Sequence, residues 1–371
     1  MSYSSPLLQR SGAVELPDSG PLDAKGVAWH YGNPLGEQRA AETAAIVVDR
    51  SHRTVLKVSG PEAPGFLNNL LSQKLDDAPA GFTSPVLDLD IQGHILHLAD
   101  VTRTADAFFL DLPADQAETF ADFLQKMIFW SQVEVERTEL ALLTVLGPAD
   151  AVSALPSSDA AAFDRAYPWP NAEVSRRDVA VPREQLTATV AAWEDKGARL
   201  AGLMAYTAER VRALVPEWAA DLDNKSIPHE VPHWIGRGDN AGAVHLDKGC
   251  YRGQETVARV ENLGRSPRVM VLLHLDGSAP TAPQPGDELR LASGNRRVGR
   301  IGTVVDDCDL GPIALGVVKR SALSAGKPDG EKSGAAALVS GETAATIDPD
   351  SLPAEEGPKA GRAAIDKLRG R

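Results

Sequence analysis

The feature that most constrains this fold is a change in hydrophobic periodicity near Leu272. Before it, short strand-like runs alternate with stretches whose apolar residues recur every three or four positions, as on an amphipathic helix. After it, strand-like runs are separated by turns rich in Gly and Pro, and they cover residues 288–291, 297–305 and 313–318. Short strands with such turns are typical of a small β-barrel or sandwich. We therefore predict an α+β chain that ends in a separate β-module.

The part before Leu272 predicts a hairpin and several helices. Residues 86–101 indicate two strands that turn near Gln92 and Gly93. Ser59 and Glu62 form a capping-box pattern, in which the Ser oxygen accepts a free N–H of the first helical turn and the Glu reaches back. The expected helices cover residues 63–71, 113–130, 183–196 and 207–215. Residues 149–171, rich in Ala, Ser, Asp and Pro, predict a domain junction or an insertion.

Composition narrows the class of protein. The chain has 371 residues and a formal net charge of −13, and direct binding to nucleic acid normally needs clustered Lys and Arg. We expect no signal peptide and no membrane span, because no apolar stretch is long enough. Two cysteines, Cys250 and Cys308, indicate no disulfide framework in a chain of this length. These features predict a cytoplasmic protein. Residues 324–334 and 350–371 predict a mobile loop and tail.

The most informative stretch runs from residue 246 to 259 and centres on Cys250. Gly249 and Gly253 bracket the thiol and permit tight or left-handed backbone. Lys248 and Arg252 lie two residues on either side, and positive charge there favours the reactive thiolate. Gln254 and Glu255 add an amide and an acceptor suited to a nitrogen-rich heterocycle. The same composition also fits an inert, buried cysteine in a charged turn.

Other patterns support weaker hypotheses. Residues 229–233 match the letters H-E-x-x-H of zinc peptidases, but Pro232 is incompatible with the continuous helix that this motif needs. We therefore predict a loop there. His94 and His97 are expected to be strand residues with local partners. The tryptophans expected in the core are Trp130, Trp193 and Trp234. Two cysteines are too few for a permanent iron–sulfur cluster in one chain; a transient cluster that shares Cys250 with another protein stays open.

Residues 248–255, with the pattern K-G-C-Y-x-G-Q-E, resemble the signature of the YgfZ family. Arg210 resembles an Arg-Ile/Val site of that family, and Glu230 closes a short I-P-x-E element. The resemblance covers residues 28–319 and includes the segments 29–39, 257–260, 262–265 and 273–277.

The resemblance implies a three-domain, cloverleaf-like α+β chain on the aminomethyltransferase fold, with folate in a central channel. The expected domains are an N-terminal folate-binding domain at 25–150, a second α+β domain with the motif at 151–271, a β-barrel at 272–345 and a tail at 346–371.

The function implied is binding of tetrahydrofolate, or a derivative, by a protein that assists assembly or repair of iron–sulfur client enzymes, including tRNA-modifying ones. Cys250 is the expected catalytic residue. The residues expected to contact the cofactor are Arg210, Glu230, Lys248, Tyr251, Arg252, Gln254, Glu255 and Arg259. The alternative is a folate-dependent one-carbon transferase or demethylase. The glycine-cleavage T-protein of this fold has an Asp pair after the hairpin glycine, whereas residues 93–98 here contain no carboxylate and the next acid is Asp100.

Overall fold

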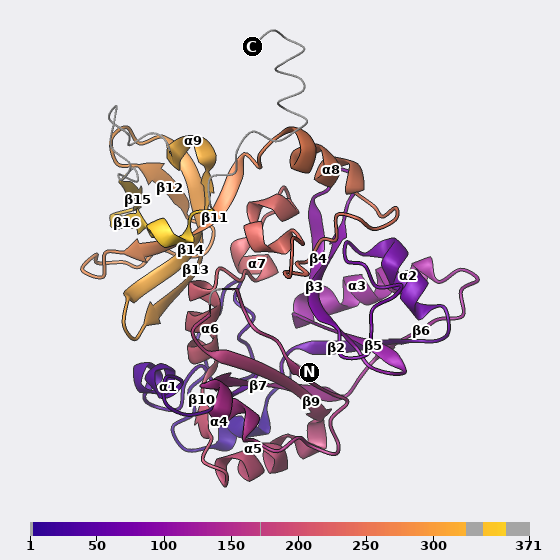
Figure 1. The fold of residues 1–371 in the computed structure, drawn as a ribbon. Coiled ribbons are helices and arrows are strands. Elements are labelled where there is room, and N and C mark those ends of the chain that lie inside the picture. Colours follow the sequence, from indigo (N-terminus) through magenta and orange to yellow (C-terminus); the bar gives the residue numbers. More distant parts are fainter. Residues whose placement is uncertain (1–2, 171, 324–336, 354–371) are drawn as a thin grey trace.

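A computed structural model of the protein describes residues 3–170, 172–323 and 337–353, and its C-terminal part is a closed β-barrel. The barrel occupies one lobe of the molecule, in orange and yellow in Figure 1. Its strands, in order around the barrel, are β11 (Arg268–Leu275), β14 (Gly311–Lys319), β13 (Arg297–Asp307), β12 (Glu288–Leu291), β15 (Leu338–Ser340) and β16 (Thr343–Ile347). The predicted β-module is thus confirmed.

A five-stranded antiparallel sheet forms a second lobe, coloured purple in Figure 1. Its order is β3 (Thr83–Leu89), β4 (Ile95–Arg103), β5 (Ala107–Leu112), β2 (Thr54–Ser59) and β6 (Glu134–Arg137). The predicted hairpin is confirmed, because β3 and β4 pair antiparallel around the turn at Gly93. Helices α2 (Ala63–Leu70) and α3 (Ala114–Met127) cover one face, where Leu67 and Phe120 are fully buried.

The third lobe contains another five-stranded sheet. Its order is β10 (Arg199–Ala201), β1 (Ile46–Asp49), β7 (Leu140–Gly147), β9 (Ser175–Pro182) and β8 (Phe163–Ala166). Every residue of β7 is buried, as expected of a continuous apolar run that is covered on both faces. One face of this sheet packs against α5 (Leu186–Glu194). The other face packs against the second lobe, where Phe163 of β8 contacts Phe109 of β5. Because β1 and β7 precede residue 150, this sheet takes strands from both sides of that expected boundary.

Shorter elements join the three lobes. Helix α6 (Leu203–Arg212) packs against β1, β13 and β14, so it links the third lobe to the barrel. The remaining helices are α1 (Pro34–Ala40), α4 (Ala149–Ser153), α7 (Trp218–Asp221), α8 (Gln254–Leu263) and α9 (Arg320–Leu323), with 3-10 turns η1 (Pro6–Gln9), η2 (Arg183–Gln185), η3 (Pro228–Glu230), η4 (Pro232–Trp234) and η5 (Pro349–Ser351). None of the helices in the described ranges is long and apolar enough to span a bilayer.

Several local predictions need correction. The capping box is wrong: Glu62 is itself the N-cap of α2 and makes no cap hydrogen bond, because its carboxylate accepts from the backbone N–H of Gln132 instead. Helix α3 ends at Met127, so Trp130 falls in the following turn and is 98% exposed rather than buried. Trp193 and Trp234 are buried as expected.

The barrel and one further turn extend beyond the expected limit at residue 345. Strand β16 continues to Ile347, and the side chain of Asp348 accepts a hydrogen bond from His274 of β11. Turn η5 follows directly. The expected mobile loop at 324–334, and the expected tail from residue 354 onward, lie outside the described residues.

Candidate functional site

The loop that carries Cys250 is bound to the second lobe by Lys248. Its ammonium group donates to the backbone carbonyls of Asn68, Leu71 and Gln73, at and just beyond the end of α2. Carbonyls at a helix end lack partners within the helix, so a cation there satisfies them. Burial lowers the pKa of Lys248 to about 8. With all three N–H groups engaged, this cation anchors the loop.

Arg252 anchors the other side of the loop. Its guanidinium donates to the carboxylate of Asp88 and to the carbonyl of Leu89, both on β3, and lies 4.7 Å from the ring centroid of Phe123. The expectation that the two flanking cations act on the sulfur of Cys250 therefore finds no support in the described contacts. Both cations instead connect distant segments of the chain to the motif, and the thiol itself is exposed.

The two motif glycines differ in their backbone. Gly253 is left-handed, with φ of +83°, and begins α8 as its N-cap. A Cβ there would lie 2.6 Å from the carbonyl oxygen of Asp90 and 3.0 Å from Gly93 Cα, so only glycine lets the hairpin turn approach this closely. Gly249 has no positive φ, and nothing lies within 4 Å of the position of an added Cβ. The expected special backbone is thus confirmed for Gly253 alone.

The other motif residues lie along this loop and α8. Tyr251 packs against the apolar cluster at the centre of the molecule, and burial raises its pKa to about 12. The side-chain oxygen of Gln254 accepts the backbone N–H of Tyr251 at 3.2 Å. Glu255 and Arg259 are exposed on α8. Tyr251 and Gln254 therefore hold the conformation of the loop, whereas Glu255 and Arg259 face solvent beside it.

A separate cavity of about 260 Å³ opens between the lobes. It is lined by β3 and β4 of the second lobe, by residues around β8 and β9 of the third, by α6, and by two connecting segments at 215–218 and 233–242. Its aromatic lining consists of Tyr167, Trp169, Tyr206, Trp218 and Trp234. Among the predicted site residues, only Arg210 belongs to this lining. The structure therefore separates the cavity from the Cys250 loop.

Beside the cavity, charged side chains fill the interface between the two five-stranded sheets. Asp178 of β9 accepts from Arg176 and Arg165, and Asp111 of β5 accepts from Arg165 and Arg53. Burial alone would raise the pKa of Asp178, but the guanidinium groups of Arg176 and Arg165 lower it well below its usual range. Buried ions of opposite sign must be paired in this way. These ion pairs therefore hold the two sheets together on the side where they border the cavity.

Arg210 is 1% exposed and is engaged within the protein. It donates to Asp221 of α7, to Thr303 of β13 and to the carbonyl of Val215, and it lies 3.2 Å from Glu217. Its charge links α6, α7 and the barrel. A folate carboxylate, the predicted partner of Arg210, would compete with these contacts, because the charge is already paired with Asp221 and Glu217. The Nε of Arg210 makes no hydrogen bond among the described residues.

Glu230 is the last residue of η3 and is buried where this turn packs against β11 of the barrel. One carboxylate oxygen accepts from Arg268 at 2.8 Å, while the other has no hydrogen-bond partner among the described residues. Burial raises the pKa of Glu230 to about 7. The H-E-x-x-H letters around it form the two short turns η3 and η4 rather than a helix, as predicted, and burial lowers the pKa of His233 to about 4.

The hairpin histidines have the local partners that we expected. Nδ1 of His94 lies 3.0 Å from Asp90, and Nδ1 of His97 lies 2.8 Å from Asp88 while its Nε2 contacts Thr119. Asp100, which follows on the same strand, faces the opposite way from His97. It shares the face of Leu98 and lines the cavity.

Apart from Arg210, Asp100, His233 and Trp234, the polar and aromatic residues of the cavity had no distinctive signal in the sequence. Tyr167 and Trp169 lie in a stretch that predicted only a junction, and Arg176 sits in the strand that follows. The alternation of β4 could have identified Asp100, because apolar Ala99 and Val101 occupy the buried helix-facing side of the strand.

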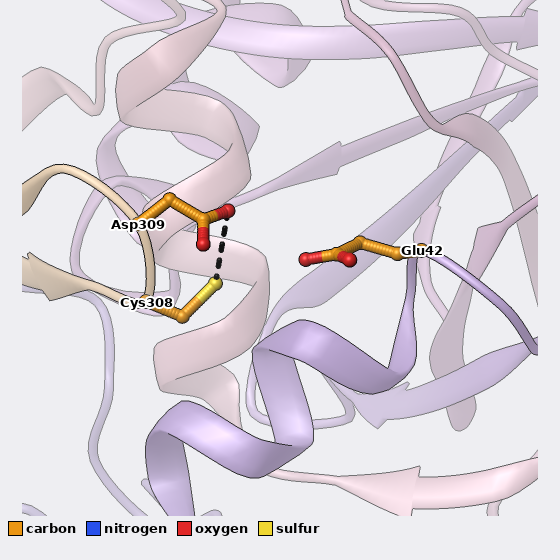
Figure 2. A group of neighbouring side chains, drawn as sticks. All are labelled: Glu42, Cys308 and Asp309. Carbon is orange, nitrogen blue, oxygen red and sulfur yellow. Dashed lines mark hydrogen bonds between the residues drawn. The ribbon is translucent and has the colours of Figure 1, made fainter.

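The second cysteine, Cys308, follows β13 of the barrel and belongs to a group of three possible metal ligands. Figure 2 shows Cys308 beside Asp309, with Glu42 pointing toward them. The sulfur and carboxylate oxygens of the three residues lie within 4.8 Å of one another. Burial and the neighbouring carboxylates of Asp307 and Asp309 raise the pKa of Cys308 to about 11. Arg39 forms an ion pair with Asp309 at 3.1 Å.

Comparison with known proteins identifies the fold of this chain as that of aminomethyltransferases. No protein-family model matches the chain. It is 27% identical over 263 residues to "tRNA-modifying protein YgfZ" of Edwardsiella ictaluri, covering 66% of this chain and 76% of that one. It is 25% identical over 336 residues to an "Aminomethyltransferase" of Corynebacterium jeikeium, covering 80% and 84%. The crystal structure of the glycine cleavage system aminomethyltransferase T from Bartonella henselae aligns with a TM-score of 0.74 at 21% identity, covering 92% and 94%.

Proposed function

Because this chain has the aminomethyltransferase fold and has relatives named both YgfZ and aminomethyltransferase, we propose that it binds tetrahydrofolate, or a derivative, in the cavity between its lobes. The observation that carries the proposal is that cavity. Its aromatic lining suits a flat heterocycle, and its volume is slightly below the range of about 300–1,000 Å³ common for small-molecule sites.

Polar groups in the lining also fit such a ligand. Ser84 Oγ and Trp169 Nε1 are buried without a hydrogen-bond partner among the described residues, and both residues line the cavity. Buried polar groups normally have partners, so unsatisfied ones beside a cavity indicate a place where a bound molecule can complete them. When bound, tetrahydrofolate supplies nitrogen atoms that accept or carry a one-carbon unit. The protein's own contribution is to enclose and orient it.

We further propose that the protein assists the assembly or repair of iron–sulfur enzymes, including tRNA-modifying ones, through Cys250. The relative named as a tRNA-modifying protein supports this role. So does the position of the thiol, which is exposed on a loop anchored by Lys248 and Arg252. The chain has two cysteines, whereas a cluster takes about four ligands. Any cluster held here is therefore shared with a partner protein.

The alternative is a folate-dependent one-carbon transferase. Asp100 favours it, because this strand places a carboxylate in the cavity although residues 93–98 contain none. Incubating purified protein with tetrahydrofolate and an aminomethyl or methyl donor distinguishes the two functions. Transfer at a rate well above a protein-free control would identify a transferase.

Two measurements test the leading proposal. Calorimetry with tetrahydrofolate and its formyl and methylene forms is expected to give a dissociation constant on the order of micromolar. Deletion of the gene is expected to lower the activity of iron–sulfur enzymes in the cell, and Cys250→Ala is expected not to restore it. Absence of binding by all three folates would remove the folate from the proposal. Full rescue by Cys250→Ala would remove the thiol.

A further inference from the structure

Asp100 is an acidic residue of the cavity lining whose hydrogen-bonding capacity is only partly used. Its Oδ1 accepts from the hydroxyl of Tyr167 at 2.7 Å, and its side chain is 19% exposed. Its Oδ2 has no hydrogen bond within the described part of the chain, and the nearest cationic nitrogen, on Arg176, lies 3.9 Å away. That distance is too long for a hydrogen bond. The carboxylate therefore retains acceptor capacity at the cavity wall.

The cations around the cavity have partners of their own. Arg176 pairs with Asp178, Arg53 with Asp111, and Arg210 with Asp221. Arg50, which also lines the cavity, donates to Thr144 and lies 3.8 Å from Asp178. Guanidinium groups that are paired in this way are poorly available to an anionic ligand. The cavity wall thus favours a ligand that donates hydrogen bonds over one that brings negative charge.

Tyr167 positions the carboxylate. It follows β8, and its ring lies 4.4 Å from the guanidinium of Arg176 and 4.9 Å from that of Arg165. Burial, together with the charge of Asp100, raises the pKa of Tyr167 well above its ordinary value, so the phenol stays protonated and donates. Because the ring is held by these contacts, the orientation of Asp100 is fixed before any ligand enters.

We propose that Asp100 determines the specificity of the cavity by accepting hydrogen bonds from the N–H edge of a 2-amino-4-oxopyrimidine, the half of a reduced pterin that carries adjacent N–H donors. A carboxylate matches two parallel N–H groups in the same way that it matches a guanidinium. Oδ1 can accept from both Tyr167 and a ligand, since an ionised carboxylate oxygen has two lone pairs. This inference rests on the proposed folate function and names the group that recognises the ring.

The test compares two ligands and three variants by calorimetry. The ligands are tetrahydrofolate and its 2-desamino analogue, which lacks the exocyclic amine. Asp100→Asn is expected to weaken tetrahydrofolate binding by roughly tenfold to hundredfold, the range for losing hydrogen bonds to a charged group. Binding of the analogue, which keeps only the ring N–H donor, is expected to weaken by a clearly smaller factor. Tyr167→Phe is expected to weaken tetrahydrofolate binding by about threefold to tenfold. Asp106→Asn, at an exposed carboxylate in the turn after β4 and outside the cavity lining, is the control and is expected to change neither affinity.

Equal losses for both ligands in Asp100→Asn would show that the residue acts only on the structure of the wall, and would overturn the proposal. An unchanged affinity for tetrahydrofolate would overturn it as well. If the wild-type protein binds neither ligand, the folate function itself fails, which separates that failure from an error about Asp100. Thermal unfolding verifies that each variant is folded. If Asp100→Asn does not fold, Tyr167→Phe gives the same comparison between ligands.

Discussion

Arg252 forms an ion pair with Asp88, and this contact joins the loop of Cys250 to the hairpin of the second lobe. Asp88 is almost completely buried, while Arg252 is about one-third exposed. The other oxygen of Asp88 contacts His97. The position of the Cys250 loop therefore depends on a carboxylate that lies more than 160 residues away in the chain.

Removing that carboxylate charge is expected to loosen the loop. Because Arg252 is partly solvated, Asp88→Asn should lower the free energy of unfolding by only about 1–2 kcal/mol, less than for a fully buried pair. Hydrogen exchange at residues 248–256 should become faster. Asp77→Asn, which removes an exposed partner of Lys74, is the control and should change neither quantity measurably. Unchanged exchange in Asp88→Asn would show that other contacts hold the loop.

The two motif glycines should respond differently to the same substitution. Gly253→Ala introduces a Cβ at a positive φ and against the carbonyl of Asp90, so we expect a loss of at least about 1–2 kcal/mol in the free energy of unfolding. Gly249→Ala meets no neighbour and should stay within about 0.5 kcal/mol of the wild type. Chemical denaturation measures both. Equal effects would contradict the role assigned to the backbone at Gly253.

The two cysteines are expected to differ in reactivity. Cys250 is exposed, whereas Cys308 is partly buried and its pKa is raised to about 11 from an ordinary value of 9.0. That rise lowers the thiolate population of Cys308 about a hundredfold near neutral pH. Iodoacetamide at pH 8 should therefore modify Cys250 at least tenfold faster, as followed by peptide mass spectrometry. Cys250→Ala should then leave a single slow phase, and a fast phase that persists would assign the reactive thiol to Cys308.

Glu209 should make stability depend on pH. Burial, followed by the charges of Asp307 and Glu173, raises its folded pKa to about 7 from 4.5, with Arg212 opposing. The folded state then binds more protons than the unfolded state between pH 4.5 and 7. The contribution of this group is therefore most favourable at low pH and declines as pH rises to 7, by up to about 3 kcal/mol.

Glu209→Gln is expected to remove that decline, so the variant should gain stability over the wild type as pH rises from 5 to 8. Urea denaturation at several pH values measures the difference. The exposed Glu255→Gln serves as the control and should follow the wild-type curve. A difference between Glu209→Gln and the wild type that does not vary with pH would assign Glu209 an ordinary carboxylate pKa.

Local sequence patterns determined much of the fold. The alternation around Gly93 predicted the β3–β4 hairpin, apolar spacing predicted α2, α3 and α5, and the Gly- and Pro-rich texture after Leu272 predicted the barrel. These features depend on residues a few positions apart, so periodicity records them directly. Pro232 likewise excluded a zinc-binding helix. The position of Trp130 was wrong because the helix before it ends one turn early, and no cap in the sequence marks that end.

Only the tertiary structure decided what surrounds the motif and what forms the cavity. Lys248 and Arg252 were expected to act on the adjacent sulfur, but their partners lie at and just beyond the end of α2 and on β3, more than 160 residues earlier in the chain. The wall of the cavity brings together Asp100, Tyr167 and Arg176 from two different sheets. Which face of β4 meets the other sheet depends on how the two sheets pack, because a strand always presents alternate residues to both sides. That packing is a property of the folded chain, and no local pattern around Asp100 contains it.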